Sequence, residues 1–364
     1  MKKRQVIGWL VLFSCCIGGT LELAAQVVSK VGVRSPQVEQ SVFPRTEIQM
    51  GDSLLQIGLE TRNAPLLVEG MWKKQQGLLA ISPDSVLPVI AQIDSLVKQC
   101  EEPVAQSMLY LMQAKIYTAQ ATSQLRYAFD ETTQNNLLLG ISNEELLKKT
   151  VTLLWKALEP ARQLQQTDVL LYKAVLTEGT ASRQLRPTMY DFVAHQAIDL
   201  LQNLQDYMAL YVDQTPVKEN YLLCPVQDFL QITFDDSPYQ VASGIFRIYQ
   251  DLLRFRETEP LSSPFLIDDL ERVEVAIRYM NDSYYSEELN NRYVDFLFGM
   301  LDTYGDNGYS AEIVRKIYAR VESSDRYEWV NRLYEWCRAA SARFVDENEQ
   351  AKVFDEVCQA LTTP

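Results

Sequence analysis

The chain has 364 residues with 34 basic and 48 acidic side chains, which gives a formal net charge of −14. Phosphate contacts require clusters of Lys and Arg, and none is visible, so the composition argues against nucleic-acid binding. The same charge disfavours adhesion to anionic lipid. An apolar content of 47% is enough for a hydrophobic core, which excludes a wholly disordered chain.

The N-terminal segment MKKRQVIGWLVLFSCCIGGTLELAAQ has the three parts of a secretory signal peptide. A basic start is followed by an apolar stretch over 6–17 and by small residues at Ala24 and Ala25. We expect cleavage near Ala25 and export to the periplasm or cell envelope. Removal of residues 1–25 leaves 31 basic and 47 acidic residues, a net charge of −16.

A second interpretation of this segment is a lipid anchor at Cys15 or Cys16. The run Leu12-Phe13-Ser14-Cys15 faintly resembles the sequence that precedes a lipidated cysteine, although Phe13 is bulky for it. No later segment reaches the length of a transmembrane helix, so we expect a mature protein without a transmembrane segment.

Residues 26–64 show no sustained helical period and predict an extended lead-in. Helical spacing then begins. Apolar residues at i, i+3, i+4 and i+7 over 86–97 predict a helix that is N-capped by Asp84 or Ser85. The next helix is expected to open at Glu102-Pro103, because proline is tolerated in a first turn.

Two capping boxes mark the helices that follow. Ser142 with Glu145 precedes the apolar run LLKKTVTLLWKAL, which Pro160 closes. Thr188 has the same spacing to Asp191. The buried face that we expect after this second box consists of Tyr190, Val193, Ala194, Ala197, Leu201 and Leu204.

Further helical patterns occupy 241–255, 266–280, 286–301, 311–321, 325–344 and 348–361. Period-2 alternation is scarce, and only QITF at 231–234 is short and β-prone. The pattern predicts an all-α protein, an irregular α-solenoid of antiparallel helix pairs. The segment 342–354 resembles the closing turn of a tetratricopeptide-type repeat, although no clean 34-residue period runs through the chain. We expect a helical domain whose first half is 65–212 and whose second half is 213–364.

The single histidine, His195, stands four residues from both Asp191 and Asp199. Steps of four keep the three on one helix face, an arrangement that can bind a metal or raise the basicity of the histidine. Divalent metals need three or four ligands, however, and one imidazole with two monodentate carboxylates is a poor zinc site. The pattern therefore favours a partly exposed helix-surface pair, and we predict no metal and no cofactor.

Adjacent acids offer a general acid–base alternative, in the pairs Asp235-Asp236, Asp268-Asp269 and Glu287-Glu288. Each pair is expected at a helix start or in a loop, where acids favour the positive helix end. The chain has no Gly-rich phosphate loop, nucleophile elbow or zinc-protease motif. We therefore predict no catalytic residue and no enzymatic activity.

Four cysteines remain after the signal segment: Cys100, Cys224, Cys337 and Cys358. They are widely spaced and include no C-x-x-C pair, which argues against a zinc site and a dense disulfide framework. Four free thiols are favoured. The alternative is a disulfide between Cys337 and Cys358, which could form in an oxidising compartment if their two helices lie antiparallel.

Aromatic residues gather in the C-terminal half of the chain. Tyr284, Tyr285, Tyr293, Trp329 and Trp336 are the candidates for an interaction surface. Aromatic stripes at helical spacing are more often core, but a concave solenoid face is the natural place for a partner. This pattern keeps open an alternative function, that of a glycan- or peptide-binding envelope protein.

Several segments together resemble the N-terminal helical region of the secreted alpha-2-macroglobulin-like proteins of Bacteroidetes bacteria. They are LRPTMYDFVAHQAIDLL, then IYQDLLRF with LIDDLERVEVAIRYM, and finally CRAASARFVDENEQAKVFDEVCQAL. They occur in the expected order and cover most of residues 100–362. In that family the helical region precedes β-sandwich domains that carry a bait region and, in many members, a Cys-Gly-Glu-Gln thioester.

The chain departs from this family in one decisive respect. It ends at Pro364, about where the first β-sandwich should begin, and none of its cysteines precedes Gly-Glu-Gln. Protease trapping, the activity that the resemblance implies, is therefore in doubt for this chain alone. No functional residue transfers from the family, because its chemistry lies in the absent part. We expect a non-catalytic structural or interaction module whose partner is a protein, either macroglobulin β-domains or another envelope protein.

Overall fold

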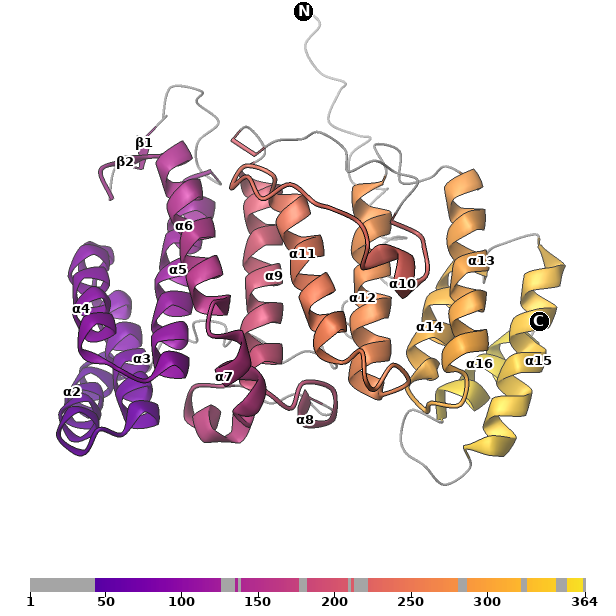
Figure 1. The fold of residues 1–364 in the computed structure, drawn as a ribbon, viewed down its shortest axis with the longest axis horizontal. Helices are drawn as coiled ribbons and strands as arrows, with labels where there is room; N and C mark the ends of the chain where they lie inside the picture. Colours follow the sequence, from indigo (N-terminus) through magenta and orange to yellow (C-terminus); the bar gives the residue numbers. More distant parts are fainter. Residues whose placement is uncertain are drawn as a thin grey trace, which may run out of the picture. The chain divides into compact units, whose positions relative to one another are not determined.

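The computed structural model describes residues 43–125, 135–136, 139–176, 182–208, 211–212, 222–280, 287–321, 326–344 and 352–362. Within these ranges the chain is helical almost throughout, which confirms the predicted all-α class (Figure 1). The strands described are the two-residue antiparallel pair β1 (Asn135–Asn136) and β2 (Ile141–Ser142). The predicted signal peptide and the candidate lipidation sites Cys15 and Cys16 lie outside the described residues.

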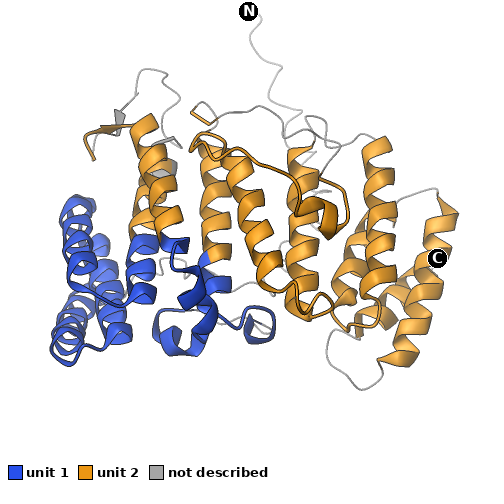
Figure 2. Cartoon of the chain, viewed as in Figure 1, with its two compact units in different colours: residues 1–112, 157–193 blue, residues 113–156, 194–364 orange. Residues whose placement is uncertain are grey.

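The chain divides into two compact units (Figure 2). Unit 1 comprises residues 1–112 and 157–193, and unit 2 comprises residues 113–156 and 194–364. The boundaries fall inside helices and not in a polar linker, and they differ from the expected division between residues 212 and 213. The helices whose sequence crosses a boundary are α5 (Pro103–Leu125), α6 (Asn143–Leu158) and α9 (Met189–Tyr207).

Unit 1 is built from short and medium helices that begin with an N-terminal pair. The elements that lie wholly within unit 1 are α2 (Pro44–Thr61), α3 (Ala64–Ile81), the 3-10 turn η1 (Pro83–Ser85), α4 (Val86–Gln99), α7 (Ala161–Gln166), the 3-10 segment η2 (Val169–Val175) and α8 (Ser182–Leu185). The apolar stripe predicted over 86–97 is the buried face of α4, since Val89 and Ile93 are fully buried.

Helix α2 corrects the expectation of an extended lead-in over 26–64. It packs against α3 through glycines on both helices, so that a Cβ at Gly51 would lie 2.7 Å from the Gly70 carbonyl oxygen. A Cβ at Gly58 would lie 2.8 Å from the Leu67 nitrogen. Glycine permits this close approach but costs about 1 kcal/mol of helix propensity per residue. It also leaves gaps in the apolar period, which is why the pattern did not predict a helix.

Side chains cap several helix starts as the sequence predicts. The Glu102 carboxylate accepts the backbone N–H of Val104 at 3.1 Å, immediately before α5. Ser142 Oγ accepts the N–H of Glu145 at 3.1 Å at the start of α6. Each bond satisfies an amide that has no acceptor within the helix, and so fixes where the helix begins.

Unit 2 contains the C-terminal helices. They are α10 (Val226–Phe229), α11 (Val241–Phe255), α12 (Ser263–Tyr279), α13 (Glu287–Tyr304), α14 (Ser310–Val321), α15 (Tyr327–Arg343) and α16 (Lys352–Thr362). Consecutive helices pack on each other in the pairs α11–α12, α13–α14 and α15–α16. The β-prone segment 231–234 forms no strand.

In unit 2, α12 and α14, which are next but one in the chain, run parallel. The Ser263 hydroxyl is 3.2 Å from Asn307 Oδ1 near the start of α14, and Lys316 Nζ is 2.7 Å from Glu274 further along α12 and α14. Because both contacts advance in the same direction along the two helices, α12 and α14 are parallel.

The same relation holds for α13 and α15. Trp329 Nε1 donates to Asp295 at 3.2 Å, and Arg332 Nη2 donates to Asp302 at 3.2 Å. Trp329 is buried, so this hydrogen bond lies in the contact between α13 and α15. Among the described helices, none combines the length and apolar character that a membrane crossing requires.

Candidate functional site

The start of α9 is fixed by the predicted capping box. Asp191 Oδ2 accepts the backbone N–H of Thr188 at 2.9 Å and its hydroxyl at 2.8 Å, and the Asp191 N–H donates back to Thr188 Oγ1 at 3.3 Å. Asp191 is fully buried. Its carboxylate is thus engaged in the cap. The apolar stripe predicted for α9 is confirmed, because all six of its members are at most 3% exposed.

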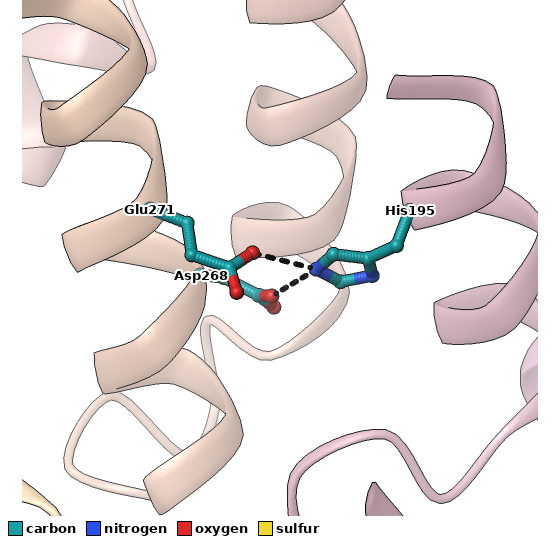
Figure 3. A group of neighbouring side chains, drawn as sticks. All are labelled: His195, Asp268 and Glu271. Carbon is teal, nitrogen blue, oxygen red and sulfur yellow. Dashed lines mark ion pairs between the residues drawn. The ribbon is translucent and has the colours of Figure 1, made fainter. Parts of the chain in front are cut away.

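His195, two turns into α9, is buried, with 5% of its surface exposed. This corrects the expectation of a partly exposed surface histidine. Its Nε2 lies 3.2 Å from Asp268 Oδ1 and 3.2 Å from Glu271 Oε2, both on α12 (Figure 3). The acids that it meets across the helix interface are therefore not the two that flank it in sequence, and the surface i,i+4 pair is the wrong description.

A fourth residue completes this site, which we call the His195 cluster: His195, Arg256, Asp268 and Glu271. Arg256 follows the last residue of α11, and its Nη1 donates to Asp268 Oδ2 at 3.1 Å. Asp268 is 2% exposed, so one buried carboxylate bridges the end of α11 and the middle of α9. Glu271 is more open, with 30% of its side chain exposed.

Helix geometry explains why α12 presents two carboxylates to His195. Residues three apart lie on one helix face, so Asp268 and Glu271 point the same way. Asp268 and Asp269 lie inside α12 and are buried, which corrects the expectation that this pair marks a helix start or loop. Asp269 is rotated by about 100° from its neighbour and meets other partners.

Those partners form a second buried site, the Arg272 cluster: Asp269, Arg272 and Tyr304. Arg272 is fully buried, and its Nε and Nη2 donate to Asp269 Oδ1 at 2.8 and 2.6 Å. Tyr304 OH donates to Asp269 Oδ2 at 2.9 Å. Burial, together with the neighbouring Asp269 carboxylate, raises the pKa of Tyr304 well above its usual range. The hydroxyl therefore stays a hydrogen-bond donor over the physiological range.

Arg272 also holds a segment of chain that precedes α10. Its Nη1 donates to the Leu222 carbonyl at 2.8 Å and its Nη2 to the Cys224 carbonyl at 2.9 Å, while the guanidinium stacks 4.6 Å above the Phe229 ring. Five donors on a planar group suit this use. The Arg272 cluster therefore ties α12, α13 and the 222–229 segment together.

The His195 cluster offers one imidazole nitrogen and two carboxylate oxygens within 4.8 Å of one another, which is a set of donors that a divalent cation can use. The positive charge of Arg256 changes the net charge of the cluster. With Arg256 positive and both acids ionised, a protonated His195 makes the cluster neutral, whereas a divalent cation on a neutral imidazole leaves one positive charge. A buried net charge is costly. The cluster therefore suits a histidine that carries its proton between two carboxylates better than a metal ion.

The third residue of the sequence pattern, Asp199, acts elsewhere. It lies on α9 near Lys115 of α5, and its negative charge partly opposes the effect of burial on that lysine. Burial lowers the pKa of Lys115 to about 8. The three residues that suggested a metal-binding helix face thus have separate surroundings.

The other acidic pairs occupy the positions that the sequence predicts. Asp235 and Asp236 are exposed in the segment before α11, where Asp235 Oδ1 accepts the N–H of Ser237 at 2.7 Å. Glu287 and Glu288 are exposed in the first turn of α13. Exposed carboxylates of this kind have ordinary structural roles at loop and helix starts.

Two of the aromatic residues proposed for an interaction surface are buried. Tyr293 is 1% exposed and Trp329 is 6% exposed, which removes both from any surface. Trp336 is partly buried, and its ring meets that of Phe354 edge to face at 5.6 Å. Tyr284 and Tyr285 lie outside the described residues. The aromatic stripe is mainly a contact face between helices, for which the large rings supply buried area.

Sequence reasoning missed Arg256, Glu271 and Arg272. Of these, only Glu271 could have been found from the sequence, because Asp268 and Glu271 have the i,i+3 spacing of a shared helix face. No sequence pattern marks Arg256 or Arg272, since an arginine near acids is ordinary in a charged helix.

Comparison with known proteins adds no relative from which a function can be taken. No protein-family model matches the chain, and no curated protein and no solved structure matches it either.

Proposed function

We propose that this protein is an exported, non-catalytic helical module of the bacterial envelope that acts by binding another protein. It is related in this proposal to the N-terminal helical region of the Bacteroidetes alpha-2-macroglobulin-like proteins. The periplasm or envelope location rests on the signal-like N-terminus, and the relationship rests on the ordered sequence blocks.

One observation carries the proposal: two of the resembling blocks, and the residue that directly follows another, meet at the His195 cluster. His195 belongs to LRPTMYDFVAHQAIDLL, Arg256 directly follows IYQDLLRF, and Asp268 with Glu271 belongs to LIDDLERVEVAIRYM. If two sequence blocks contact each other in this chain and both resemble blocks of another protein, the corresponding blocks of that protein are expected to contact each other too. The resemblance therefore supports a shared helical core.

The same geometry favours an architectural role for the polar residues. Within the described residues, the buried acids of both clusters are each paired with an arginine from their own or a neighbouring helix. Carboxylates held in this way orient helices, and they are poorly placed to exchange protons with a substrate. A non-enzymatic function fits that arrangement.

The finer architecture that we propose is an irregular α-solenoid with tetratricopeptide-like helix pairs. Its support is the parallel relation of α12 with α14 and of α13 with α15, because stacked helical hairpins place every second helix in the same direction. Repeats of this kind present extended surfaces to protein partners.

The first test concerns the partner. The DNA next to this reading frame is to be inspected for β-sandwich domains of the macroglobulin type, and any such product co-purified with this chain and sized by light scattering. We expect a complex of one copy of each. Separate elution of the two folded proteins at micromolar concentration overturns the assignment of β-domains as the partner.

The second test concerns catalysis. Purified protein is to be assayed against peptide, ester and glycoside substrates beside the variant His195→Gln, with the fold of both checked by circular dichroism. We expect no turnover above buffer in either protein. Turnover that is present in the natural chain and lost in folded His195→Gln overturns the non-catalytic proposal.

The alternative function, a glycan- or peptide-binding protein with an aromatic surface, has less support because Tyr293 and Trp329 are buried. Titration with envelope polysaccharide while tryptophan fluorescence is followed separates the two functions. Saturable quenching that is lost in Trp336→Leu, with the fold retained, favours the glycan-binding alternative.

A further inference from the structure

Two cysteines lie together where α15 packs against α16. Cys337 on α15 is fully buried, and Cys358 on α16 is partly buried. Cys358 Sγ donates to the carbonyl oxygen of Tyr334 at 3.7 Å, one turn before Cys337 on the same helix. The two thiols are also hydrogen bonded to each other. The pair is therefore within reach of a disulfide after a small adjustment of side chains.

The surrounding packing keeps the two thiols opposite each other. Phe354 on α16 lies 5.6 Å from the Trp336 ring and 5.6 Å from the Phe344 ring, both on or next to α15. Phe354 is fully buried, so this contact fixes the register of the two helices one turn from Cys358. A fixed register matters because a disulfide tolerates little variation in Cα separation.

We propose that Cys337 and Cys358 are a modification site at which an intramolecular disulfide locks α16 onto α15. The co-reactant is a small disulfide such as oxidised glutathione, or the disulfide of a thiol oxidoreductase. Its formation in the cell rests on the proposed envelope location, because disulfides persist in oxidising compartments. Its formation in a purified sample does not depend on that location.

The exchange proceeds in two balanced steps. The Cys358 thiol, which is the more exposed, loses its proton, and its sulfur attacks the oxidant to give a mixed disulfide and one released thiol. The Cys337 sulfur, after losing its proton, then attacks the Cys358 sulfur and releases the second thiol. Two protein thiols are oxidised and one disulfide is reduced to two thiols.

Burial raises the pKa of the Cys337 thiol and also that of the Cys358 thiol. A thiol whose pKa is raised supplies little thiolate at neutral pH, so the closure is expected to be slow at pH 7 and faster at pH 9. Cys100 provides a comparison, since it is also buried and lies in unit 1, away in sequence from any other described cysteine.

The experiment uses the full chain, reduced under native conditions and then exposed to oxidised glutathione at pH 8. Free thiols are blocked by alkylation and the unreduced digest is mapped by mass spectrometry. We expect a peptide that links Cys337 with Cys358, and an upward shift of the melting temperature of about 5–10 °C. Cys100→Ser is the matched control, and it should give the same linked peptide.

Two single variants test the order of the steps. Cys337→Ser should retain glutathione on Cys358, because the resolving thiol is absent. Cys358→Ser should take up little glutathione, because Cys337 is fully buried. Stable glutathione on Cys358 in the natural folded chain, or no linked peptide after complete exposure, overturns the proposal.

The same alkylation performed on whole cells separates the disulfide from the proposed location. A linked peptide in cells supports both. A pair that closes in the purified protein but is fully reduced in cells leaves the modification site standing and overturns the envelope location.

Discussion

Asp268 and Asp269 are neighbours on α12, yet their carboxylates accept hydrogen bonds from different arginines. Arg256 meets Asp268 at 3.1 Å, and Arg272 meets Asp269 at 2.6 Å. A dipeptide on a helix can reach two flanks in this way because successive residues are about 100° apart. Each buried carboxylate thereby has its own arginine. The two ion pairs fix both the position of α12 and its rotation about the helix axis.

Replacing Arg272 by Met is expected to destabilise the protein by about 3–5 kcal/mol, because Asp269 then stays buried without its cation. The free energy of unfolding is to be measured with urea. The double variant Asp269→Asn with Arg272→Met should recover part of the loss. Arg338→Ala removes an exposed pair with Glu335 and should cost less than about 1 kcal/mol. Equal losses for Arg272→Met and Arg338→Ala contradict this assignment.

Replacing His195 by Ala is expected to cost about 3 kcal/mol, since it leaves Asp268 and Glu271 facing each other. His195→Gln should cost less, because an amide can still donate to a carboxylate. The order of the two variants in urea unfolding is the decisive measurement. A value for His195→Ala within error of the natural chain shows that these ion pairs do not stabilise the fold.

Titration with zinc or manganese is expected to give no binding heat that depends on His195. The reason is the Arg256 guanidinium, which already holds one oxygen of Asp268. Calorimetry of the natural chain beside His195→Ala provides the comparison. Saturable one-to-one binding that disappears in the folded variant would falsify the charge argument and identify a metal site.

Glycine-to-alanine substitutions at the α2–α3 contact and on the open face of α13 are expected to have opposite effects on stability. Gly51→Ala should destabilise the protein, because the new Cβ would lie 2.6 Å from the Lys74 nitrogen. Gly299→Ala on α13 has open space and should stabilise by about 0.5–1 kcal/mol through helix propensity. Thermal unfolding of both variants checks the sign. A Gly51→Ala variant as stable as the natural chain contradicts the close approach of α2 and α3.

The lowered pKa of Lys115 is expected to make the free energy of unfolding depend on pH at moderately alkaline pH. Burial lowers its pKa to about 8 from 10.5, so between these values the unfolded chain binds more protons than the folded one. Stability should therefore rise with pH across that window. The difference in unfolding free energy between the natural chain and Lys115→Met, measured from pH 7 to pH 10, isolates this contribution. A flat difference contradicts the lowered pKa.

Much of the helical pattern could be predicted because it depends on local rules. Ser142 and Thr188 lie at helix starts as their capping-box spacing indicates, and Glu102 lies at a helix start as the proline that follows it indicates. The apolar stripe of α9 was likewise visible as a period. Helix α2 was missed because its contact face is made of glycine, which carries no hydrophobic signal.

The candidate site could be predicted only in part, and the reason lies in distance along the chain. The spacing of Asp191, His195 and Asp199 is local, so the pattern suggested that they act on one another. The partners of His195 lie more than 70 residues later on α12. A pattern within one helix contains no information on which helix packs against it. The burial of His195 could therefore not be predicted from this pattern.

The glycine contact between α2 and α3 has a consequence for how this part of the chain folds. Helix α2 contains two glycines and buries few large side chains, so by itself it is only marginally stable. Its hydrogen bonds persist because α3 lies against its backbone. The two helices should therefore open and close as one cooperative unit, with matching amide exchange rates, and a change that loosens α3 alone would unwind α2 with it.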